Sequence, residues 1–316
     1  MSKVLEMAAR YFGIDVEYAF SIMQSASHRY KVYKIPKRQA GKFRTIAQPA
    51  KEVKMLQRWL VQEVICDLPI HDAATAYREG HGIKVNAERH LQNAYLLKMD
   101  FKKFFPSIKE GDLTTHIEKH LPGKFSTQDI DLICRVALWK PKRKQELELS
   151  IGGPSSPFIS NSIVYDFDVL VSDACANMNV TYTRYADDLA FSTNEKGILK
   201  DVEGLVAQTC EAVAYPTLRI NAEKTVHSSK KHRRFVTGIT LSNQGKLSLG
   251  RNRKRIIRAM IHRAINGLLS ADETASLKGL LAFALDVEPQ FVESMRTKYG
   301  AGQIKALLKW EPTNRK

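Results

Sequence analysis

The chain has 316 residues, 44% of them hydrophobic, and a formal net charge of +16 at pH 7. This size predicts a core divided into two or three subdomains, and the charge predicts a polyanionic partner, with nucleic acid favoured over a membrane surface. No apolar run approaches the roughly 20 residues of a transmembrane helix, and no signal peptide is recognisable, so a cytoplasmic protein without a membrane partner is expected.

The first part of the chain is predicted to form helices around one β-hairpin. Residues 1–24 have the apolar spacing of a helix, with a second short helix near residues 17–23. Residues 30–36 alternate like a strand, and the alternation resumes at residues 45–47 after a basic loop that can reach phosphates or be an ordinary solvated turn. Residues 51–68 then predict an amphipathic helix with the following apolar side: Met55, Leu56, Trp59, Leu60 and Val64.

Carboxylates stand at the ends of two predicted strands. Residues 94–99 have a buried-strand pattern that ends at Asp100, and residues 180–192 predict a hairpin with Asp187 and Asp188 at its tip. Adjacent side chains on a strand point to opposite faces, so a third carboxylate is needed, and Asp100 can supply it. Three carboxylates at one place could bind Mg²⁺ for phosphoryl transfer. The alternative is that Asp187 and Asp188 belong to an ordinary turn, where Asp is common.

The remaining pattern is helical and basic. Residues 111–140 predict helix, and Gly152 and Gly153 precede a further helix that is expected to run from Pro157 through Leu170. Backbone amides ahead of that helix can bind phosphate, although a tight helix-entry turn explains the two glycines equally well. A helix over residues 251–269 is expected to expose a basic face to a polyanion and to bury a stripe of Ile256, Ile257, Met260, Ile261 and Ile265.

These motifs, in this order, resemble those of reverse transcriptases, and specifically of bacterial retron reverse transcriptases. Residues 185–188 resemble the catalytic box, residues 99–107 the first metal-binding motif, and residues 220–225 the motif that follows the box. Residues 154–157 with Asn161 resemble the template-side motif. The N-A-x-x-H element of retron enzymes matches residues 86–90, and their V-T-G element matches residues 236–238.

One position departs from the family pattern. Retron and related enzymes usually have Leu-Pro-Gln-Gly ahead of the template-side motif, whereas this chain has Leu149, Ser150, Ile151 and Gly152. Ile151 therefore stands where a polar Gln normally contacts the nucleotide region. The departure leaves the candidate metal ligands unchanged.

The resemblance implies an α+β fold, a right-hand polymerase with fingers, a palm of antiparallel sheet and helices, and a helical thumb. The expected parts are an N-terminal helical extension (1–27), fingers (28–95), first part of the palm (96–110), a fingers and palm insertion (111–150), palm (151–240) and an RNA-binding thumb (241–316).

The resemblance also implies the roles of individual residues. The catalytic residues would be Asp100, Asp187, Asp188 and Lys224, with Lys224 assisting the pyrophosphate leaving group. Two Mg²⁺ ions would be held by the three carboxylates and the backbone carbonyl of Phe101. The nucleotide would be bound by Lys42, Arg44, Gly152 and Phe105, the last placing its ring under the sugar to exclude a 2′-hydroxyl. RNA would be bound by Asn86, His90, Val236, Thr237, Gly238, Arg251, Arg253, Lys254 and Arg255, with His90 as a purely structural histidine being the alternative.

The implied function is that of an RNA-directed DNA polymerase that uses dNTP substrates. It would copy part of a cognate structured non-coding RNA into RNA-linked single-stranded DNA (msDNA), primed from an internal guanosine 2′-hydroxyl. Because the chain is expected to end with the thumb, a host ribonuclease H would remove the RNA template. A separate effector or toxin protein would be a further partner, as part of an anti-phage system. The alternatives are a group II intron or abortive-infection type of reverse transcriptase and a non-catalytic RNA-binding scaffold or antitoxin.

Overall fold

The computed structural model describes residues 2–37 and 41–311, so residues 38–40 of the expected basic loop and residues 312–316 of the expected thumb lie outside the described part. The chain begins with two capped helices: the Ser2 hydroxyl accepts a hydrogen bond from Leu5 N, and the Asp15 carboxylate accepts one from Tyr18 N. The elements of this first part are α1 (Lys3–Phe12), α2 (Val16–Ser25), the 3₁₀ turn η1 (Ala26–His28), β1 (Tyr30–Pro36), β2 (Phe43–Pro49), α3 (Lys51–Trp59) and the π-helical turn η2 (Leu60–Val64).

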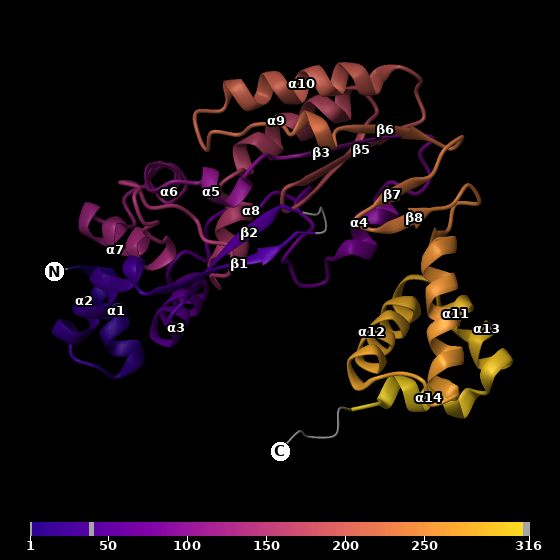
Figure 1. Cartoon of the computed structure of the whole chain (residues 1–316). Coiled ribbons are helices and arrows are strands. Elements are labelled where there is room, and N and C mark those ends of the chain that lie inside the picture. The colour runs from indigo at the N-terminus through magenta and orange to yellow at the C-terminus, as the bar shows by residue number, and fades with distance from the viewer. Residues whose placement is uncertain (1, 38–40, 312–316) are drawn as a thin grey trace.

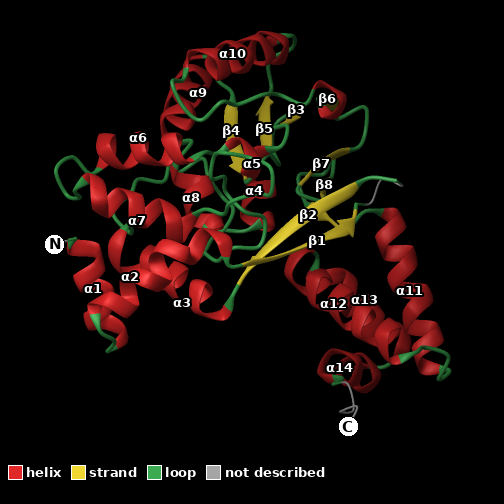
Figure 2. Cartoon of the chain, turned by 60° about the vertical axis from the view of Figure 1, so that its left-hand side comes forward, coloured by secondary structure: helices red, strands yellow, loops and turns green. Residues whose placement is uncertain are grey.

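A two-stranded hairpin projects from this helical part. β1 and β2 pair antiparallel over their full lengths, with Tyr30 opposite Pro49 and Pro36 opposite Phe43. The predicted hairpin is therefore confirmed, but its second strand begins earlier than expected and includes Arg44. In both Figure 1 and Figure 2 the hairpin lies between the N-terminal helices and the C-terminal helices.

The centre of the molecule is a four-stranded antiparallel sheet with the strand order β4-β5-β3-β6. Its strands are β3 (Tyr95–Asp100), β4 (Thr181–Tyr185), β5 (Asp188–Thr193) and β6 (Val226–Ser229). Two helices, α9 (Tyr165–Asn177) and α10 (Ile198–Ala212), cover one face (Figures 1 and 2). Successive strand side chains point to opposite faces, so Leu97 belongs to the large core under these helices, whereas Leu96 belongs to a second core.

Short helices connect the sheet to the N-terminal part: α4 (Ile83–Arg89), α5 (Phe104–Ser107), α6 (Glu110–His120), α7 (Thr127–Ala137) and α8 (Ser156–Ser162). The single helix expected from Pro157 through Leu170 is wrong, because the structure has two helices, α8 and α9, with a turn at residues 163–164. This break brings side chains of both helices, Asn161 and Asp168, onto the same buried arginine.

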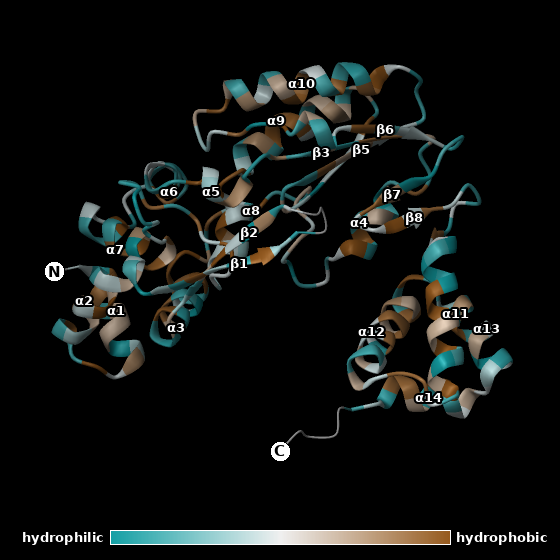
Figure 3. Cartoon of the chain, viewed as in Figure 1, coloured by the Kyte–Doolittle hydropathy of each residue, from teal (hydrophilic) through white to brown (hydrophobic). Residues whose placement is uncertain are grey.

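The C-terminal part is a helical lobe whose core is continuous with the second core of the central sheet, which includes Leu96. The turn η3 (Ala222–Lys224) lies against β3, just before β6. The lobe comprises β7 (Arg234–Val236), β8 (Ile239–Leu241), β9 (Leu247–Ser248), α11 (Arg251–Ile265), α12 (Ala271–Val287), α13 (Pro289–Tyr299) and α14 (Ala301–Lys309). The strands β7, β8 and β9 form a small antiparallel sheet that joins the lobe to the central sheet. The N-terminal turns of α11, next to β8, are hydrophilic in Figure 3.

Some positions predicted for the core are exposed. Met55 is 45% exposed, whereas Gln57 on the same helix is buried. Burial of this polar side chain is tolerated because the Gln57 amide donates a hydrogen bond to Val136 O at 2.8 Å. The stripe of α11 is narrower than predicted: Ile257 and Ile261, one turn apart, are buried, whereas Ile256 and Ile265 are 50% and 40% exposed. Leu170 of α9 is also half exposed. In the described part of the chain, no helix has the length and apolar character that crossing a bilayer requires.

Candidate active site

The turn of residues 185–188, here called the Asp-Asp turn, connects β4 and β5 tightly. Tyr185 pairs with Asp188, and Ala186 between them has a φ of 57°, which is uncommon for a residue other than glycine. The Asp187 carbonyl accepts a hydrogen bond from Phe101 N at 3.0 Å. This bond fastens the Asp-Asp turn to the chain just beyond β3, where Asp100 lies.

The structure brings the three predicted carboxylates to one end of the sheet. Asp100 lies directly opposite Asp188 in the pairing of β3 with β5, and its side chain is buried. The Asp100 carboxylate accepts hydrogen bonds from Lys224 Nζ at 2.6 Å and from Asn221 Nδ2 at 3.2 Å. The structure therefore places Lys224 beside these acidic groups.

The carboxylates of the Asp-Asp turn repel one another. Burial, and then the charge of Asp100, raise the pKa of Asp187, although Lys224 and Arg44 oppose this increase. Asp188 is exposed at the surface, yet the surrounding protein and the charges of Asp187 and Asp100 raise its pKa to about 6. Burial lowers the pKa of Lys224, but its hydrogen bond to Asp100 and the three negative charges produce a net increase. A bound cation would relieve this repulsion.

The donor set fits a hard divalent cation. Carboxylate oxygens are the ligands that Mg²⁺ prefers. The ammonium group of Lys224 already forms an ion pair with the Asp100 carboxylate. Within the described residues, however, no three His, Cys, Asp or Glu side chains converge into a closed group of metal ligands. The site is thus an open acidic cluster whose repulsion favours cation binding.

The predicted nucleotide-binding residues lie on different elements. Lys42 and Arg44 are exposed on the β1–β2 hairpin, and Arg44 is close enough to Asp187 for its charge to lower the pKa of that carboxyl group. Phe105 is half-buried, and its ring packs edge-on against Phe104, with 5.6 Å between ring centroids. Hairpin and acidic cluster therefore face a common region.

The loop at Gly152 is fastened to the hairpin. Ala47 N of β2 donates a hydrogen bond to Ile151 O at 3.0 Å, a contact that does not depend on the side chain at position 151. Gly152 has a φ of 122°, and a Cβ atom there would lie 3.2 Å from Ile46 Cγ2 and 3.3 Å from Ala47 O. Only glycine suits this close approach, so Gly152 sets the position of the hairpin that carries Arg44.

The expected direct contact of Asn86, His90 and Val236 with RNA is wrong, because all three side chains are at most 1% exposed. His90 Nδ1 lies 2.7 Å from Ser192 Oγ and Nε2 lies 2.7 Å from Thr183 Oγ1, so the imidazole joins α4 to the central sheet. His90 is therefore a structural histidine, which was the alternative interpretation of this position.

The two elements typical of retron enzymes meet at one junction. Thr183 Oγ1 donates a hydrogen bond to Asn86 Oδ1 at 2.5 Å, and Thr237 Oγ1 donates one to Ile83 O at 3.0 Å. Gly238, with a φ of 83°, accepts a bond from Arg253 Nη1 at 3.0 Å. This junction holds α4, the central sheet and the C-terminal lobe together.

The burial of His90 makes the protein sensitive to acid. Burial, with a smaller contribution from Arg89, lowers the pKa of His90 to about 3, whereas an unfolded histidine has a pKa near 6.5. Between these values the unfolded chain binds the additional proton, so the free energy of unfolding should fall as the pH decreases from about 6.5 towards 3. Denaturant titrations at several pH values should show this loss, and His90→Gln should make it less steep.

A matched control is His262→Gln, because His262 is exposed on α11. This substitution should leave the pH dependence unchanged. Burial also lowers the pKa of His116 to about 3, so part of the acid sensitivity should remain in His90→Gln. An unaltered slope in His90→Gln would contradict the assignment.

The four basic residues at the start of α11 divide into two pairs. Arg251 and Arg255 are exposed, as expected for an RNA-binding face. Lys254 Nζ lies 2.5 Å from Glu288 Oε1, and Arg253 packs over the Phe283 ring at 4.7 Å, so these two side chains also hold the lobe together.

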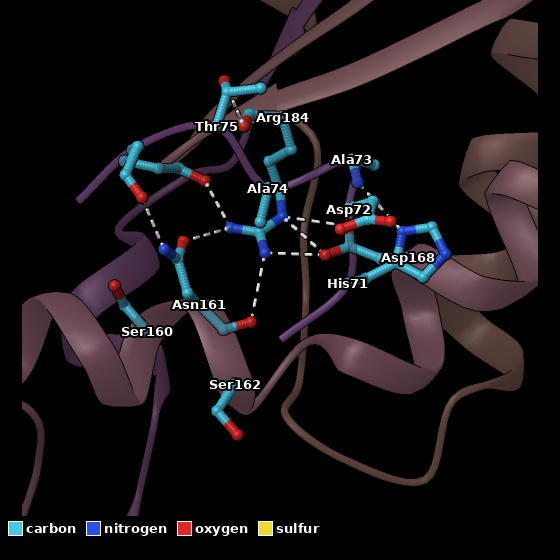
Figure 4. A network of polar contacts seen from close by, with 12 residues as sticks. His71, Asp72, Ala73, Ala74, Thr75, Ser160, Asn161, Ser162, Asp168 and Arg184 are labelled. Carbon is cyan, nitrogen blue, oxygen red and sulfur yellow. Dashed lines mark hydrogen bonds and ion pairs between the residues drawn. The ribbon is translucent and has the colours of Figure 1, made fainter. Parts of the chain in front are cut away.

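Sequence reasoning missed a buried arginine next to the Asp-Asp turn. Arg184 is fully buried, and its guanidinium group donates hydrogen bonds to the Asp168 carboxylate and to Asn161 (Figure 4). It also donates one to Ala186 O. Its backbone N–H donates a hydrogen bond to Ala73 O, and its carbonyl accepts one from Thr75 N. Both partners belong to the loop before α4. The only sequence signal was a charged residue in a strand that otherwise consists of threonine and tyrosine.

Sequence reasoning also missed Tyr77. This tyrosine is 52% exposed, has a φ of 60°, and lies beside Tyr185 with 6.4 Å between ring centroids. No pattern in the sequence distinguishes it from other loop aromatics.

Comparison with known proteins agrees with this site. The family model for reverse transcriptase (RNA-dependent DNA polymerase) matches residues 35–241. Retron Ec83 reverse transcriptase of Escherichia coli is 43% identical over 287 residues, covering 90% of this chain and 91% of that protein. Retron Ec73 reverse transcriptase of the same organism is 33% identical over 301 residues, covering 89% and 90% respectively.

A solved structure of apo telomerase from Candida Tropicalis is 12% identical with a TM-score of 0.49, covering 87% of this chain and 60% of that one. The family model and the sequence relatives identify the chain. It belongs to the reverse transcriptase family, as a bacterial retron reverse transcriptase with the right-hand polymerase fold, and is an RNA-directed DNA polymerase.

Proposed function

We propose that the chain copies part of a cognate structured non-coding RNA into RNA-linked single-stranded DNA, starting from an internal guanosine 2′-hydroxyl. The observation that carries DNA synthesis at this site is the pairing of Asp100 opposite Asp188, with Asp187 fastened beside them through Phe101 N. The retron-specific product is supported by the two elements that resemble those of retron enzymes, residues 86–90 and residues 236–238, of which Asn86 bonds to Thr183 and Thr237 bonds to Ile83 at the start of α4.

The acidic cluster would hold two Mg²⁺ ions through Asp100, Asp187, Asp188 and the carbonyl of Phe101. When bound, the metal would lower the pKa of the primer hydroxyl and stabilise the departing pyrophosphate. Lys224 would remain beside the cluster as a proton donor or a positive charge for the pyrophosphate. The mutual repulsion of Asp187 and Asp188 supports this assignment.

The dNTP would bind between the hairpin and the acidic cluster. Lys42 and Arg44 would contact the triphosphate, since the guanidinium group suits bidentate phosphate binding. Gly152 would position the hairpin through its contact with β2. The ring of Phe105 would lie under the sugar.

This role of Phe105 predicts a change in sugar selection. Phe105→Ala should raise the ratio of kcat/KM for GTP to that for dGTP by about tenfold or more, because the ring no longer excludes the 2′-hydroxyl. Phe105→Tyr, which keeps the ring, should retain discrimination. Steady-state incorporation on one primer and template gives both ratios. If Phe105→Ala slowed both nucleotides equally, Phe105 would be a packing residue rather than a gate.

RNA would be held by the exposed basic face of α11, including Arg251 and Arg255, through phosphate contacts. The packing of α11, α12, α13 and α14 around one hydrophobic core supports a thumb over residues 241–316. We extend the proposal to the other divisions, namely an N-terminal extension (1–27), fingers (28–95), palm (96–110 and 151–240) and an insertion (111–150). A host ribonuclease H and a separate effector protein of an anti-phage system are the remaining partners.

The test is the nucleic acid that co-purifies with the wild-type protein and with an Asp187→Asn, Asp188→Asn double variant, analysed before and after ribonuclease treatment. Short single-stranded DNA joined to RNA should be present in the wild type only. RNA alone in both samples would make the protein a binder and would contradict the proposed catalysis at this site.

A further inference from the structure

A strained aromatic residue borders the acidic cluster. The Tyr77 side chain is 52% exposed, although its ring lies against that of Tyr185 in the Asp-Asp turn. Burial raises the pKa of Tyr77, the nearby charges of Asp187 and Tyr185 raise it further, and Arg44 opposes them. Tyr77 therefore lies where the hairpin and the Asp-Asp turn face each other.

The backbone conformation of Tyr77 is costly. A φ of 60° is a genuine outlier for a bulky side chain, and such strain persists only when the surroundings enforce it. Here they do so: Asn161 Nδ2 donates a hydrogen bond to Ala76 O at 2.6 Å, and Arg78 Nη1 donates to His71 O and Ala74 O. Strain of this kind is typical of ligand-binding and active sites.

The loop that carries Tyr77 is fixed to two elements of the site. Thr75 N donates a hydrogen bond to Arg184 O at 2.8 Å, next to the Asp-Asp turn. Asn161 belongs to α8, and Figure 4 shows residues 71–75 beside this helix and Arg184. The exposed ring is thus displayed between the Asp-Asp turn and α8.

We propose that Tyr77 is a template-binding residue whose ring stacks on the RNA base that pairs with the incoming nucleotide. This inference rests on the proposed location of the polymerase site. Within that site the hairpin cations would face the triphosphate and Phe105 would face the sugar. The Tyr77 loop is instead bonded to Asn161 of α8, which belongs to the segment that resembles the template-side motif. An exposed aromatic ring stacks on any base, which suits a template of varying sequence.

The test measures the affinity for a DNA primer annealed to an RNA template, without dNTP, by fluorescence anisotropy. One template has a normal base at the first unpaired position, and the other has an abasic ribose there. Tyr77→Ala and Tyr77→Gly should both weaken binding of the normal template by about fivefold or more. Tyr77→Phe and Tyr77→Trp should bind like the wild type. On the abasic template the wild type and all variants should bind equally.

Matched variants separate stacking from loop geometry. Gly tolerates a positive φ and Ala does not, so normal affinity in Tyr77→Gly alone would assign the effect to the backbone and overturn the proposal. Tyr18→Ala is the surface control, since Tyr18 is 54% exposed on α2. Equal weakening on both templates, or a higher KM for dNTP at unchanged template affinity, would also overturn it.

Repeating the binding measurement in an Asp187→Asn background distinguishes the two proposals. If that variant still polymerised, the assignment of the catalytic site would fail. The dependence of binding on Tyr77 and on the templating base would remain measurable, because binding needs no turnover. Should Tyr77→Ala fail to fold, the loss of wild-type affinity on the abasic template still decides whether the base is recognised.

Discussion

Replacing Asp187 by Asn should reduce DNA synthesis by about 10³-fold or more, because Asp187 is a proposed metal ligand and such a ligand contributes several kcal/mol of transition-state stabilisation. Asparagine has nearly the same shape as aspartate but lacks its charge. The hydrogen bond from Phe101 N to the carbonyl of residue 187 involves only backbone, so the Asp-Asp turn should keep its position. The rate of single-nucleotide incorporation on a preformed primer and template measures this loss.

Folding and RNA binding should survive the substitution. The charge of Asp187 helps to raise the pKa of Asp188, so neutralising it removes repulsion, and the melting temperature should be unchanged or higher without metal. Affinity for RNA should stay near that of the wild type. Asp173→Asn is the matched control, since Asp173 is exposed on α9, and it should retain activity. Substantial synthesis by Asp187→Asn would remove this carboxylate from the catalytic site.

The acidic cluster could be predicted because local patterns determine it. Alternating segments on both sides of residues 185–188 indicate a hairpin with two carboxylates at its tip, and the strand pattern before Asp100 indicates a second strand end. What sequence could not supply was the register. Only the pairing of β3 with β5 shows that Asp100 lies opposite Asp188.

The errors arose where burial depends on distant parts of the chain. A polar motif such as Asn86 with His90 is compatible with RNA binding until the central sheet is seen to cover both side chains with Thr183 and Ser192. The break between α8 and α9 also depends on a distant residue, because Asn161 of α8 and Asp168 of α9 both bind Arg184, which is buried on β4. Helical periodicity alone cannot predict such contacts.

Arg184 connects the Asp-Asp turn to the rest of the polymerase. Its guanidinium group binds both Asp168 carboxylate oxygens, at 2.6 to 3.1 Å, and also contacts Asn161 and the carbonyl of Ala186. The Tyr182 hydroxyl donates a further bond to Asp168. Because Ala186 precedes Asp187 directly, the same side chain that satisfies a buried carboxylate also supports the acidic cluster.

Arg184→Met should therefore be strongly destabilising. It leaves the Asp168 carboxylate buried without its cation, and breaking a buried ion pair in this way costs about 3–5 kcal/mol. Ala186 O, next to Asp187, also loses its hydrogen-bond donor. The protein that remains folded should therefore polymerise more slowly than the wild type. Denaturant unfolding measures the first effect, and incorporation kinetics well below the unfolding transition measure the second.

Comparison with an exposed ion pair tests whether burial is the cause. Arg135→Met breaks the Arg135–Asp131 pair on α7, whose side chains are 34% and 44% exposed, and should cost at most about 1 kcal/mol. A double variant, Arg184→Met with Asp168→Leu, removes both charges and should recover part of the lost stability. It should not recover full activity, because the Ala186 carbonyl still lacks its donor. Equal losses of stability in Arg184→Met and Arg135→Met would show that burial is not the cause of the destabilisation.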